Sequence, residues 1–386
     1  MSCGKGTVHR ILLLADKLSA GGFCRKPVRG TMKEKKMKKP GYIQPGDTIG
    51  LVAPSFGAAI EPYITRLDAA IRKFEKRGYH VRIADSCYKS DGLGISTNPA
   101  DAAKDVMDFY LDDGIDAVIS VGGGELMNET TACLDFEKLG AAEPKWYLGY
   151  SDNTNFLFPM ATLFDVPGIY GPCATGFGKE WEQTEQDTFS VLEGRAACFE
   201  GCRMYERPDD ETRTENPLAP YHLTETARPI AFMPGSRGME HAEGEKVRLK
   251  GRLLGGCLDV LENLSGTRFD GTKGFAERHR EEGIIWMLEA CDLSPMSIRR
   301  TIWHLKMQGW FEHAAGFLIG RPLAALGVDM MGVDQYNAVT DILAELEVPI
   351  IMDAPFGHVA PMTPLVIGSE IQAELEDSVL KVEMTL

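Results

Sequence analysis

The stretch IDAVISVGGGELMNE, residues 115–129, predicts the fold class of this chain. Its first seven residues form an apolar run typical of a buried strand, and three glycines lead from that run into a helix-favouring segment. A buried strand that passes through a tight turn into a helix is the repeating unit of a parallel sheet. The glycines would let the backbone approach a ligand, and the helix N-terminus would favour negative charge. A tight turn with no role in binding is the alternative.

The same alternation of strand and helix continues on both sides of this stretch. Apolar runs predict strands, and 3.6-residue periodicity or capping signals predict helices. Strands are predicted at 48–53, 80–84, 115–121 and 146–150, and helices at 61–77, at 98–112 and from 153 to about 164. This alternation of strands and helices indicates an α/β domain with a parallel sheet over residues 41–180.

The second half of the chain predicts a β-rich α/β domain at residues 226–386. Between the two domains, residues 181–225 are rich in Glu, Thr, Asp and Pro, which predicts a linker with one helix at 183–193. The apolar runs and periodic segments of the second domain predict six strands and two helices. Strands are expected within 248–256 (a strand and then a turn) and at 284–289, 315–320, 348–352, 364–375 and 379–385, with helices at 257–265 and 297–308.

The charge of the chain is unevenly distributed. The formal net charge is −15, but the first 40 residues carry 11 basic and 2 acidic side chains. We therefore predict a disordered basic leader at 1–40, before an acidic body that is unsuited to nucleic acid. An apolar stretch long enough to span a membrane is missing, and nine cysteines in a long chain are typical of reduced thiols in the cytoplasm. No zinc-type spacing of Cys or His predicts a metal site.

Common cofactor motifs are also missing from the sequence. It has no GxxxxGK[ST], no HExxH and no GxGxxG after the first strand. This argues against nucleotide-dependent and zinc-dependent enzymes, and we expect no cofactor. A flavodoxin-like protein that binds flavin or a nucleotide is an alternative from a different functional class.

Three polar positions are candidates for chemistry. Ser151, in Gly149-Tyr150-Ser151-Asp152-Asn153, lies where a strand meets a helix; this resembles a nucleophile elbow but also an ordinary helix cap. Glu289 ends an apolar strand, and His358 lies in a loop between glycine and proline residues. A nucleophile, a carboxylate and a histidine in this order would form a hydrolase triad. A solvated histidine and a surface carboxylate are the alternatives.

Several stretches together resemble the LD-carboxypeptidase and microcin-immunity-type serine peptidase family. The matching stretches are GDTIGLVAPS (46–55), ISVGGGELMNE (119–129), KWYLGYSDNTN (145–155), IYGP (169–172), LKGRLLGGCLDVLENLSGT (249–267), IIWMLEA (284–290), GFLIGRP (316–322) and PIIMDAPFGH (349–358). The resemblance implies an N-terminal flavodoxin-like parallel-sheet domain and a smaller C-terminal β-rich α/β domain, with the active site between them. It also implies a cytoplasmic homodimer that cuts an amide before a C-terminal residue without a metal.

The resemblance further implies roles for single residues. Glu289 and His358 match the catalytic Glu and His, and the amides of Gly123 and Gly124 would help to form an oxyanion hole. The nucleophile is expected shortly after these glycines, where this chain has Leu126 or Met127. Neither side chain can attack a carbonyl.

Ser151 and Asp152 belong to the separate GYSD segment, which we expect to bind substrate near the cleft. The sequence thus predicts a hydrolase that acts on a murein tetrapeptide or a related peptide conjugate, with Ser151 as the first choice for a relocated nucleophile. A water activated by His358, with no covalent step, is a second route. A degenerate family member that binds such amides without cutting them is the alternative. Arg321, in a GRP stretch, would hold a substrate carboxylate or serve as a structural ion-pair partner.

Overall fold

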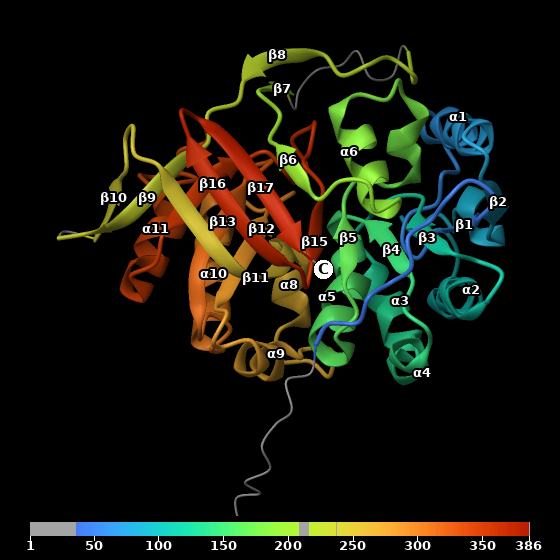
Figure 1. Ribbon diagram of the computed structural model, residues 1–386, viewed down its shortest axis with the longest axis horizontal. Coiled ribbons are helices and arrows are strands. Elements are labelled where there is room, and N and C mark those ends of the chain that lie inside the picture. Colours follow the sequence, from blue (N-terminus) through green and yellow to red (C-terminus); the bar gives the residue numbers. More distant parts are fainter. Residues whose placement is uncertain (1–35, 208–215, 237, 386) are drawn as a thin grey trace, which may run out of the picture. The chain divides into compact units, whose positions relative to one another are not determined.

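Two β-sheets organise the part of the chain that the structure, a computed structural model, describes: residues 36–207, 216–236 and 238–385. The first sheet has the strand order β15-β5-β4-β3-β1-β2 (Figure 1). Its strands are β1 (Thr48–Val52), β2 (His80–Ile83), β3 (Ala117–Ser120), β4 (Trp146–Gly149), β5 (Gly168–Tyr170) and β15 (Leu365–Ile367). All neighbours pair in parallel except β15 and β5. The predicted parallel sheet is therefore confirmed.

Helices connect the strands of the first sheet. The predicted helix at 98–112 forms because Asn98 caps it, accepting a hydrogen bond from the amide of Asp101, and Pro99 occupies its first turn. These helices are α1 (Tyr63–Lys76), α2 (Pro99–Leu111), α3 (Met127–Cys133), α4 (Phe136–Ala141), α5 (Thr154–Phe164) and α6 (Gln183–Leu192), with short 3₁₀ turns η1 (Asp85–Tyr88), η2 (Ser151–Asn153) and η3 (Ala174–Gly178).

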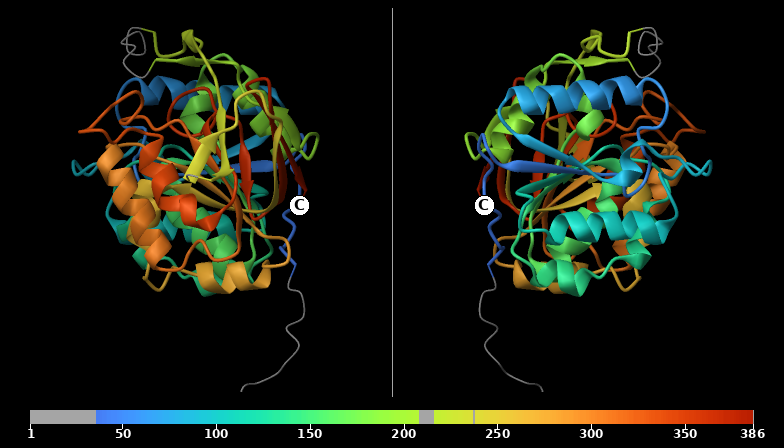
Figure 2. Two further views of the ribbon diagram at one scale, coloured as in Figure 1. Left: turned by 90° about the vertical axis from the view of Figure 1, so that its left-hand side faces the viewer. Right: turned by 90° about the vertical axis from the view of Figure 1, so that its right-hand side faces the viewer.

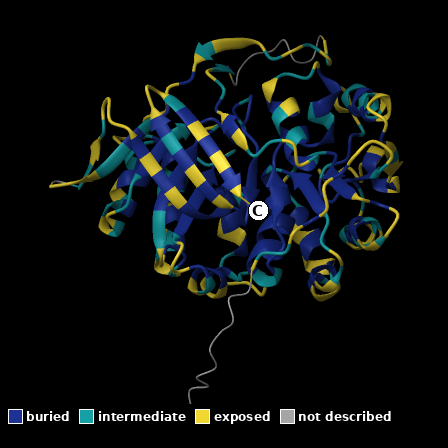
Figure 3. Cartoon of the chain, in the orientation of Figure 1, coloured by how far each residue is buried: buried dark blue, intermediate teal, exposed yellow. Residues whose placement is uncertain are grey.

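The second sheet has nine strands in the order β10-β9-β14-β13-β12-β11-β16-β17-β6. They are β6 (Cys198–Glu200), β9 (Ile230–Gly235), β10 (Gly238–His241), β11 (Val247–Cys257), β12 (Ile284–Glu289), β13 (Ala314–Gly320), β14 (Ile350–Ala354), β16 (Glu370–Glu376) and β17 (Val379–Thr385). The four strands β14, β13, β12 and β11 are parallel. Along β16 and β17 exposed and buried residues alternate, as expected when one face of a sheet is solvated (Figure 3).

Helices of the second half cover the parallel strands. They are α8 (Leu258–Leu264), α9 (Thr272–Arg278), α10 (Pro295–Met307), α11 (Asn337–Leu343) and the 3₁₀ turn η4 (Ala344–Leu346). Figure 2 shows α10 and α11 side by side, and the two helices contact each other. The turn predicted at the end of 248–256 is wrong, because β11 continues to Cys257. Glycine at 256 allows the end of the strand to pass close to α5, since a Cβ there would lie 2.6 Å from the Thr154 side chain.

Helix α5 contacts strands of both sheets, β5 of the first and β11 of the second. Nearly every side chain along it is buried. Phe156 stacks on Tyr147 of β4 with ring centroids 4.1 Å apart, and Phe158 stacks on Trp310 at 5.0 Å. Apolar packing on both sides therefore anchors α5, and with it the turn that precedes the helix.

The two sheets exchange edge strands across the predicted domain boundaries. Strand β15 comes from the C-terminal stretch but pairs with β5 of the first sheet, while β6 precedes residue 226 but pairs with β17 of the second. The segment predicted as a linker, 181–225, is therefore not a simple linker where the structure describes it. It contains α6, β6 and the pair β7 (Met204–Glu206) and β8 (Leu223–Thr226). The predicted domain boundaries at 180 and 226 divide the chain into consecutive segments. The two sheets do not follow these boundaries, because β15 and β6 each pair with a strand from another segment.

The predicted leader, 1–40, lies outside the described residues up to position 35. Its last residues contact the body: the amide of Lys38 donates to the Asp165 carbonyl at 2.7 Å, and Met37 packs against the core. The boundary predicted at residue 41 therefore comes too late. None of the helices in the described residues is long and apolar enough to cross a membrane.

Candidate active site

The turn between β4 and α5 places Ser151 in a conformation that is rare for serine. Its φ is +61°, in the left-handed region, and the residue is largely buried. Such backbone strain costs on the order of 1–3 kcal/mol and is found where a side chain must be presented at a sharp turn. Strand, turn and helix follow each other here as in a nucleophile elbow. The alternative of an ordinary helix cap is wrong, because the Ser151 hydroxyl lies 2.8 Å from His358 Nε2 and caps no helix.

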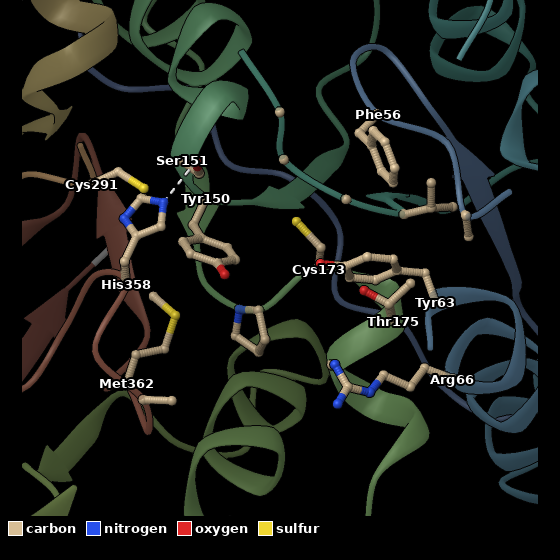
Figure 4. Close-up of a pocket in the computed structure, with 18 of the residues that line it drawn as sticks. Phe56, Tyr63, Arg66, Tyr150, Ser151, Cys173, Thr175, Cys291, His358 and Met362 are labelled. Atoms are coloured by element: carbon tan, nitrogen blue, oxygen red, sulfur yellow. Dashed lines mark hydrogen bonds between the residues drawn. The ribbon is translucent and has the colours of Figure 1, made fainter. Parts of the chain in front are cut away.

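A chain of hydrogen bonds runs from Ser151 through His358 to Glu289. His358 Nδ1 lies 2.7 Å from Glu289 Oε2, and His358 Nε2 lies 2.8 Å from Ser151 Oγ (Figure 4). A carboxylate only accepts, so Nδ1 carries the proton and Nε2 of the neutral ring is free to accept the serine hydroxyl. The predicted Glu289 and His358 are thus brought together, although 69 residues separate them.

Burial and charge act in opposite directions on this pair. Burial opposes ionisation of Glu289, but the hydrogen bonds and charge of His358, together with the Tyr170 hydroxyl, lower the pKa of Glu289 below its usual range. Burial likewise lowers the pKa of His358, but the Glu289 carboxylate outweighs burial and holds it well above 6.5. The carboxylate is therefore ionised at neutral pH and stabilises an imidazolium.

Two further residues hold this arrangement in place. Tyr170, at the end of β5, donates a hydrogen bond to Glu289 Oε1 at 2.6 Å and accepts one from the Ser151 amide at 3.1 Å. Gly357 precedes the histidine with φ +98°, and a Cβ there would lie 2.6 Å from Glu289 Oε2. The sequence analysis did not single out Tyr170, although it lies in the quoted IYGP stretch.

The glycine turn after β3 lies directly against Ser151. A Cβ on Gly123 would be 3.1 Å from Ser151 Oγ, and no described residue accepts a hydrogen bond from the amides of Gly123 and Gly124. Free amides beside a hydroxyl held by a histidine are suited to stabilise an oxyanion. The predicted neighbourhood of Gly123, Gly124 and Ser151 is therefore present.

The Asp152 side chain connects the elbow to neighbouring segments of the chain. It is buried, with its Oδ2 accepting hydrogen bonds from Ser55 Oγ at 2.5 Å and from the Met127 amide at 2.8 Å. Burial raises its pKa, although these hydrogen bonds oppose the shift. Asp152 thus ties the start of α3 to the elbow, and its expected role in substrate binding stays a prediction.

The two candidate turns differ in what they place beside His358. After the glycine turn, Met127 is fully buried at the start of α3, whereas the side chain that meets His358 Nε2 is Ser151, the first choice for a relocated nucleophile. Both turns end parallel strands and enter helices, so local sequence could not show which one faces His358.

The strain at Ser151 leads to a prediction about stability. We expect Ser151→Gly to be more stable than Ser151→Ala by about 1 kcal/mol, because glycine adopts positive φ without a Cβ clash. Both variants lack the hydroxyl and its hydrogen bond to His358, so alanine is the matched control. Urea unfolding of the two proteins measures the difference. Equal midpoints, or a more stable alanine variant, would contradict strain at this turn.

A pocket of about 560 Å³ opens in front of Ser151 and His358 (Figure 4). Aromatic rings and two cations, Arg66 and Lys179, line it, and Figure 4 shows Arg66 on the opposite side from Ser151. The Lys179 ammonium lies 4.2 Å from the ring centre of Tyr221. The pocket can therefore hold an elongated ligand with an anionic end.

Arg321 does not line this pocket. It is buried, and its Nη2 donates to the carbonyls of Val359 and Pro361 at 3.1 and 3.4 Å. A structural role therefore fits Arg321 better than a substrate contact, through hydrogen bonds that fasten the loop carrying His358 rather than through the ion pair that was expected.

Cys257, Glu289 and His358 are the group of described residues whose ligand atoms lie close enough to hold a metal ion, within 4.8 Å of one another. Burial and neighbouring carboxylates raise the pKa of the Cys257 thiol well above its usual range, so it stays protonated. Glu289 and His358 are already bonded to each other. This donor set is a poor fit for a resident cation.

Comparison with known families matches both halves of the chain. Residues 49–171 match the LD-carboxypeptidase N-terminal domain, and residues 250–373 match the LD-carboxypeptidase C-terminal domain.

Individual relatives agree with the family models. The chain is 26% identical over 352 residues to a putative carboxypeptidase of Streptomyces coelicolor, covering 88% of this chain and 95% of the relative. It is 24% identical over 335 residues to a probable murein peptide carboxypeptidase of Bacillus subtilis, covering 86% of this chain and 90% of the relative. Among solved structures, an MccF-like protein from Bacillus anthracis superposes with a TM-score of 0.72 at 20% identity, over 90% of this chain and 99% of that protein. The structural match supports the fold alone.

Proposed function

The chain belongs to the LD-carboxypeptidase family, and we propose that it is an active, metal-independent serine hydrolase that cuts an amide before a C-terminal residue. The observation that carries this proposal is the continuous hydrogen-bond chain Ser151–His358–Glu289 beside the open pocket. The alternative of a binder that does not cut was based on Leu126 or Met127 at the expected nucleophile position; the Ser151 hydroxyl beside His358 supports the hydrolase instead.

The reaction uses the chain's own groups. Ser151 Oγ attacks the scissile carbonyl carbon and passes its proton to His358 Nε2, while Glu289 stabilises the imidazolium. The oxyanion of the tetrahedral intermediate is stabilised by the amides of Gly123 and Gly124. His358 then donates its proton to the leaving amine and the C–N bond breaks. A water, deprotonated by His358, cleaves the acyl-enzyme and restores Ser151.

The pocket supports a peptide substrate with a free C-terminal carboxylate. Arg66 and Lys179 supply positive charge to attract that carboxylate, and Tyr63 and Tyr150 offer rings for the peptide to pack on. Since a Bacillus subtilis relative is named a probable murein peptide carboxypeptidase, we propose a murein tetrapeptide or a related peptide conjugate as the substrate. The homodimer and the cytoplasmic location that the sequence implied stay predictions.

Release of the C-terminal residue tests the proposal. The full chain is incubated with a tetrapeptide that ends in L-Lys-D-Ala, and free D-Ala is measured beside His358→Ala. We expect release from the wild type and none above background from the variant. Release that His358→Ala leaves intact would contradict the mechanism. Tight binding of the peptide by calorimetry without release would support the non-cutting alternative.

The pKa directions predict how the reaction depends on pH. His358 must be neutral to accept the serine proton, and Glu289 holds the pKa of His358 well above 6.5. We therefore expect kcat/KM to rise with pH and to level off only above the usual titration range of histidine. A pH profile measured over pH 5 to 10 tests this. A plateau already reached below pH 6.5 would contradict the raised pKa.

A further inference from the structure

The aromatic ring of Tyr150 lies against the imidazole of His358. The two ring centroids are 5.1 Å apart, and the ring planes are tilted by 52° (Figure 4). Tyr150 directly precedes Ser151, so the turn that presents the hydroxyl also carries this ring. The imidazole is thus hydrogen-bonded at both nitrogens and packed against an aromatic side chain.

Contacts with neighbouring residues hold Tyr150 in this position. Its backbone is extended, with φ −143° and ψ −174°, and its carbonyl oxygen accepts hydrogen bonds from the Asn153 amide at 3.2 Å and from Asn153 Nδ2 at 3.0 Å. The ring meets Tyr170 edge to face, with centroids 6.2 Å apart. No hydrogen bond joins the Tyr150 hydroxyl to a residue that the structure describes, and Figure 4 shows this hydroxyl at the end of the ring away from Ser151. The ring is therefore the part of Tyr150 that acts on the imidazole.

An aromatic ring stabilises a positive charge more than it stabilises a neutral group. Its face carries partial negative charge, so a cation within about 6 Å of the ring centroid is attracted to it. In the proposed reaction His358 is neutral at first and becomes positively charged when it takes the serine proton. The Tyr150 ring therefore favours the state after proton transfer, and an interaction that is stronger in the transition state than in the ground state raises kcat.

Other titratable groups also face the imidazole. Glu289, at the end of β12, is hydrogen-bonded to Nδ1 and stabilises the same positive charge. The Cys291 thiol comes from the segment after β12, and Tyr170 reaches Glu289 from β5. Burial raises the pKa of the Cys291 thiol and of the Tyr150 phenol, so both are neutral at physiological pH. Tyr150 thus acts on the imidazolium through its ring and carries no charge of its own.

We propose that Tyr150 is a positioning residue for the general base: its ring keeps the His358 imidazole directed at Ser151 and stabilises the imidazolium that forms when the serine proton is transferred. The proposal rests on the hydrolase function proposed above. Tyr150 then affects kcat in addition to any contact that it makes with the peptide. Because the nucleophile and the aromatic support of its base are adjacent in the sequence, one turn sets the positions of both.

Three substitutions at Tyr150 separate the ring from the hydroxyl. Tyr150→Phe keeps the ring, whereas Tyr150→Leu and Tyr150→Met replace it by apolar side chains of different shape. We expect kcat for D-Ala release to stay within about threefold of the wild type in Tyr150→Phe and to fall by about 5- to 30-fold in the other two. Tyr63→Leu, which removes a ring on the opposite side of the same pocket, is the control for substrate binding; it should raise KM and leave the pH profile unchanged.

The titration of His358 provides a measurement that needs no turnover. Because the ring favours the charged imidazole, its removal should lower the pKa of His358 by about 0.5–1.5 pH units, whereas Tyr150→Phe should keep the wild-type value. NMR titration of the imidazole measures this change, and thermal unfolding shows which variants are folded.

Each outcome either supports or overturns the proposal. A loss of activity in Tyr150→Phe as large as in Tyr150→Leu would assign the effect to the hydroxyl and overturn it. An unchanged His358 titration in Tyr150→Leu and Tyr150→Met would also overturn it. If even the wild type releases no D-Ala, the proposed hydrolase function fails, while a lowered titration midpoint in these two variants still supports the role of the ring.

Discussion

Replacing Ser151 by alanine is expected to reduce amide hydrolysis by about 10⁴- to 10⁶-fold, with the fold retained. In the proposed reaction the hydroxyl is both the attacking group and the proton donor to His358 Nε2, 2.8 Å away. Removing one member of such a unit costs nearly as much as removing all of them, because the members act together. Release of D-Ala measures the loss, and calorimetry shows whether the substrate still binds.

The informative comparison for this variant is Cys291→Ala. The Cys291 thiol lines the same pocket beside the same imidazole, so it is a second side chain there that could attack a carbonyl. Burial raises its pKa, which keeps the thiol protonated and a weaker nucleophile. A fluorophosphonate probe should label the wild type at Ser151 and fail to label Ser151→Ala. Activity that survives in Ser151→Ala and disappears in Cys291→Ala would assign the attack to the thiol.

Replacing Glu289 by glutamine is expected to reduce kcat by about 10³- to 10⁴-fold. The carboxylate fixes the proton on His358 Nδ1, whereas a glutamine amide facing Nδ1 can donate to it and move the imidazole proton to Nε2. With the proton on Nε2, the ring cannot accept the Ser151 hydrogen. The same change removes the charge that raises the pKa of His358, so the residual activity should level off at a lower pH than in the wild type.

Two controls separate this effect from a loss of structure. Glu281→Gln makes the same charge change at a side chain that is 89% exposed, and we expect wild-type kinetics from it. Thermal unfolding of Glu289→Gln shows whether the buried amide is tolerated. A variant that folds, keeps wild-type kcat and keeps the wild-type pH profile would contradict the role assigned to Glu289.

Tyr170 links the two residues that these variants change, Ser151 and Glu289. Its hydroxyl joins Glu289 Oε1 to the Ser151 amide, so the elbow and the carboxylate are held by one side chain at the end of β5. Ser151, Tyr170, Glu289 and His358 come from different elements. Ser151 follows β4, Tyr170 ends β5 and Glu289 ends β12. This agrees with the general tendency of parallel sheets to bind ligands at the carboxyl ends of their strands.

Local pattern in the sequence was sufficient for most of the parallel architecture. The strands at 48–52, 117–120 and 284–289 and the helices at 63–76 and 99–111 all lie close to their predicted positions. Such elements depend on hydrophobic periodicity and capping residues within a short window, which a single sequence displays. Glu289 and His358 could be named for a related reason: each lies next to a strand or turn that is recognisable by itself.

Which side chain meets His358 could be decided only by the tertiary structure. Two turns, at Gly123 and at Ser151, had the same local signature, and the choice depends on which one meets a histidine 207 residues away from Ser151. The edge strands β15 and β6 and the pocket in front of Ser151 are likewise assembled from distant segments. Strand and helix signals are local, whereas contacts between distant segments depend on how the sheets pack around α5. The sequence therefore determined the elements of this fold and singled out Glu289 and His358, and packing decided which hydroxyl meets the imidazole.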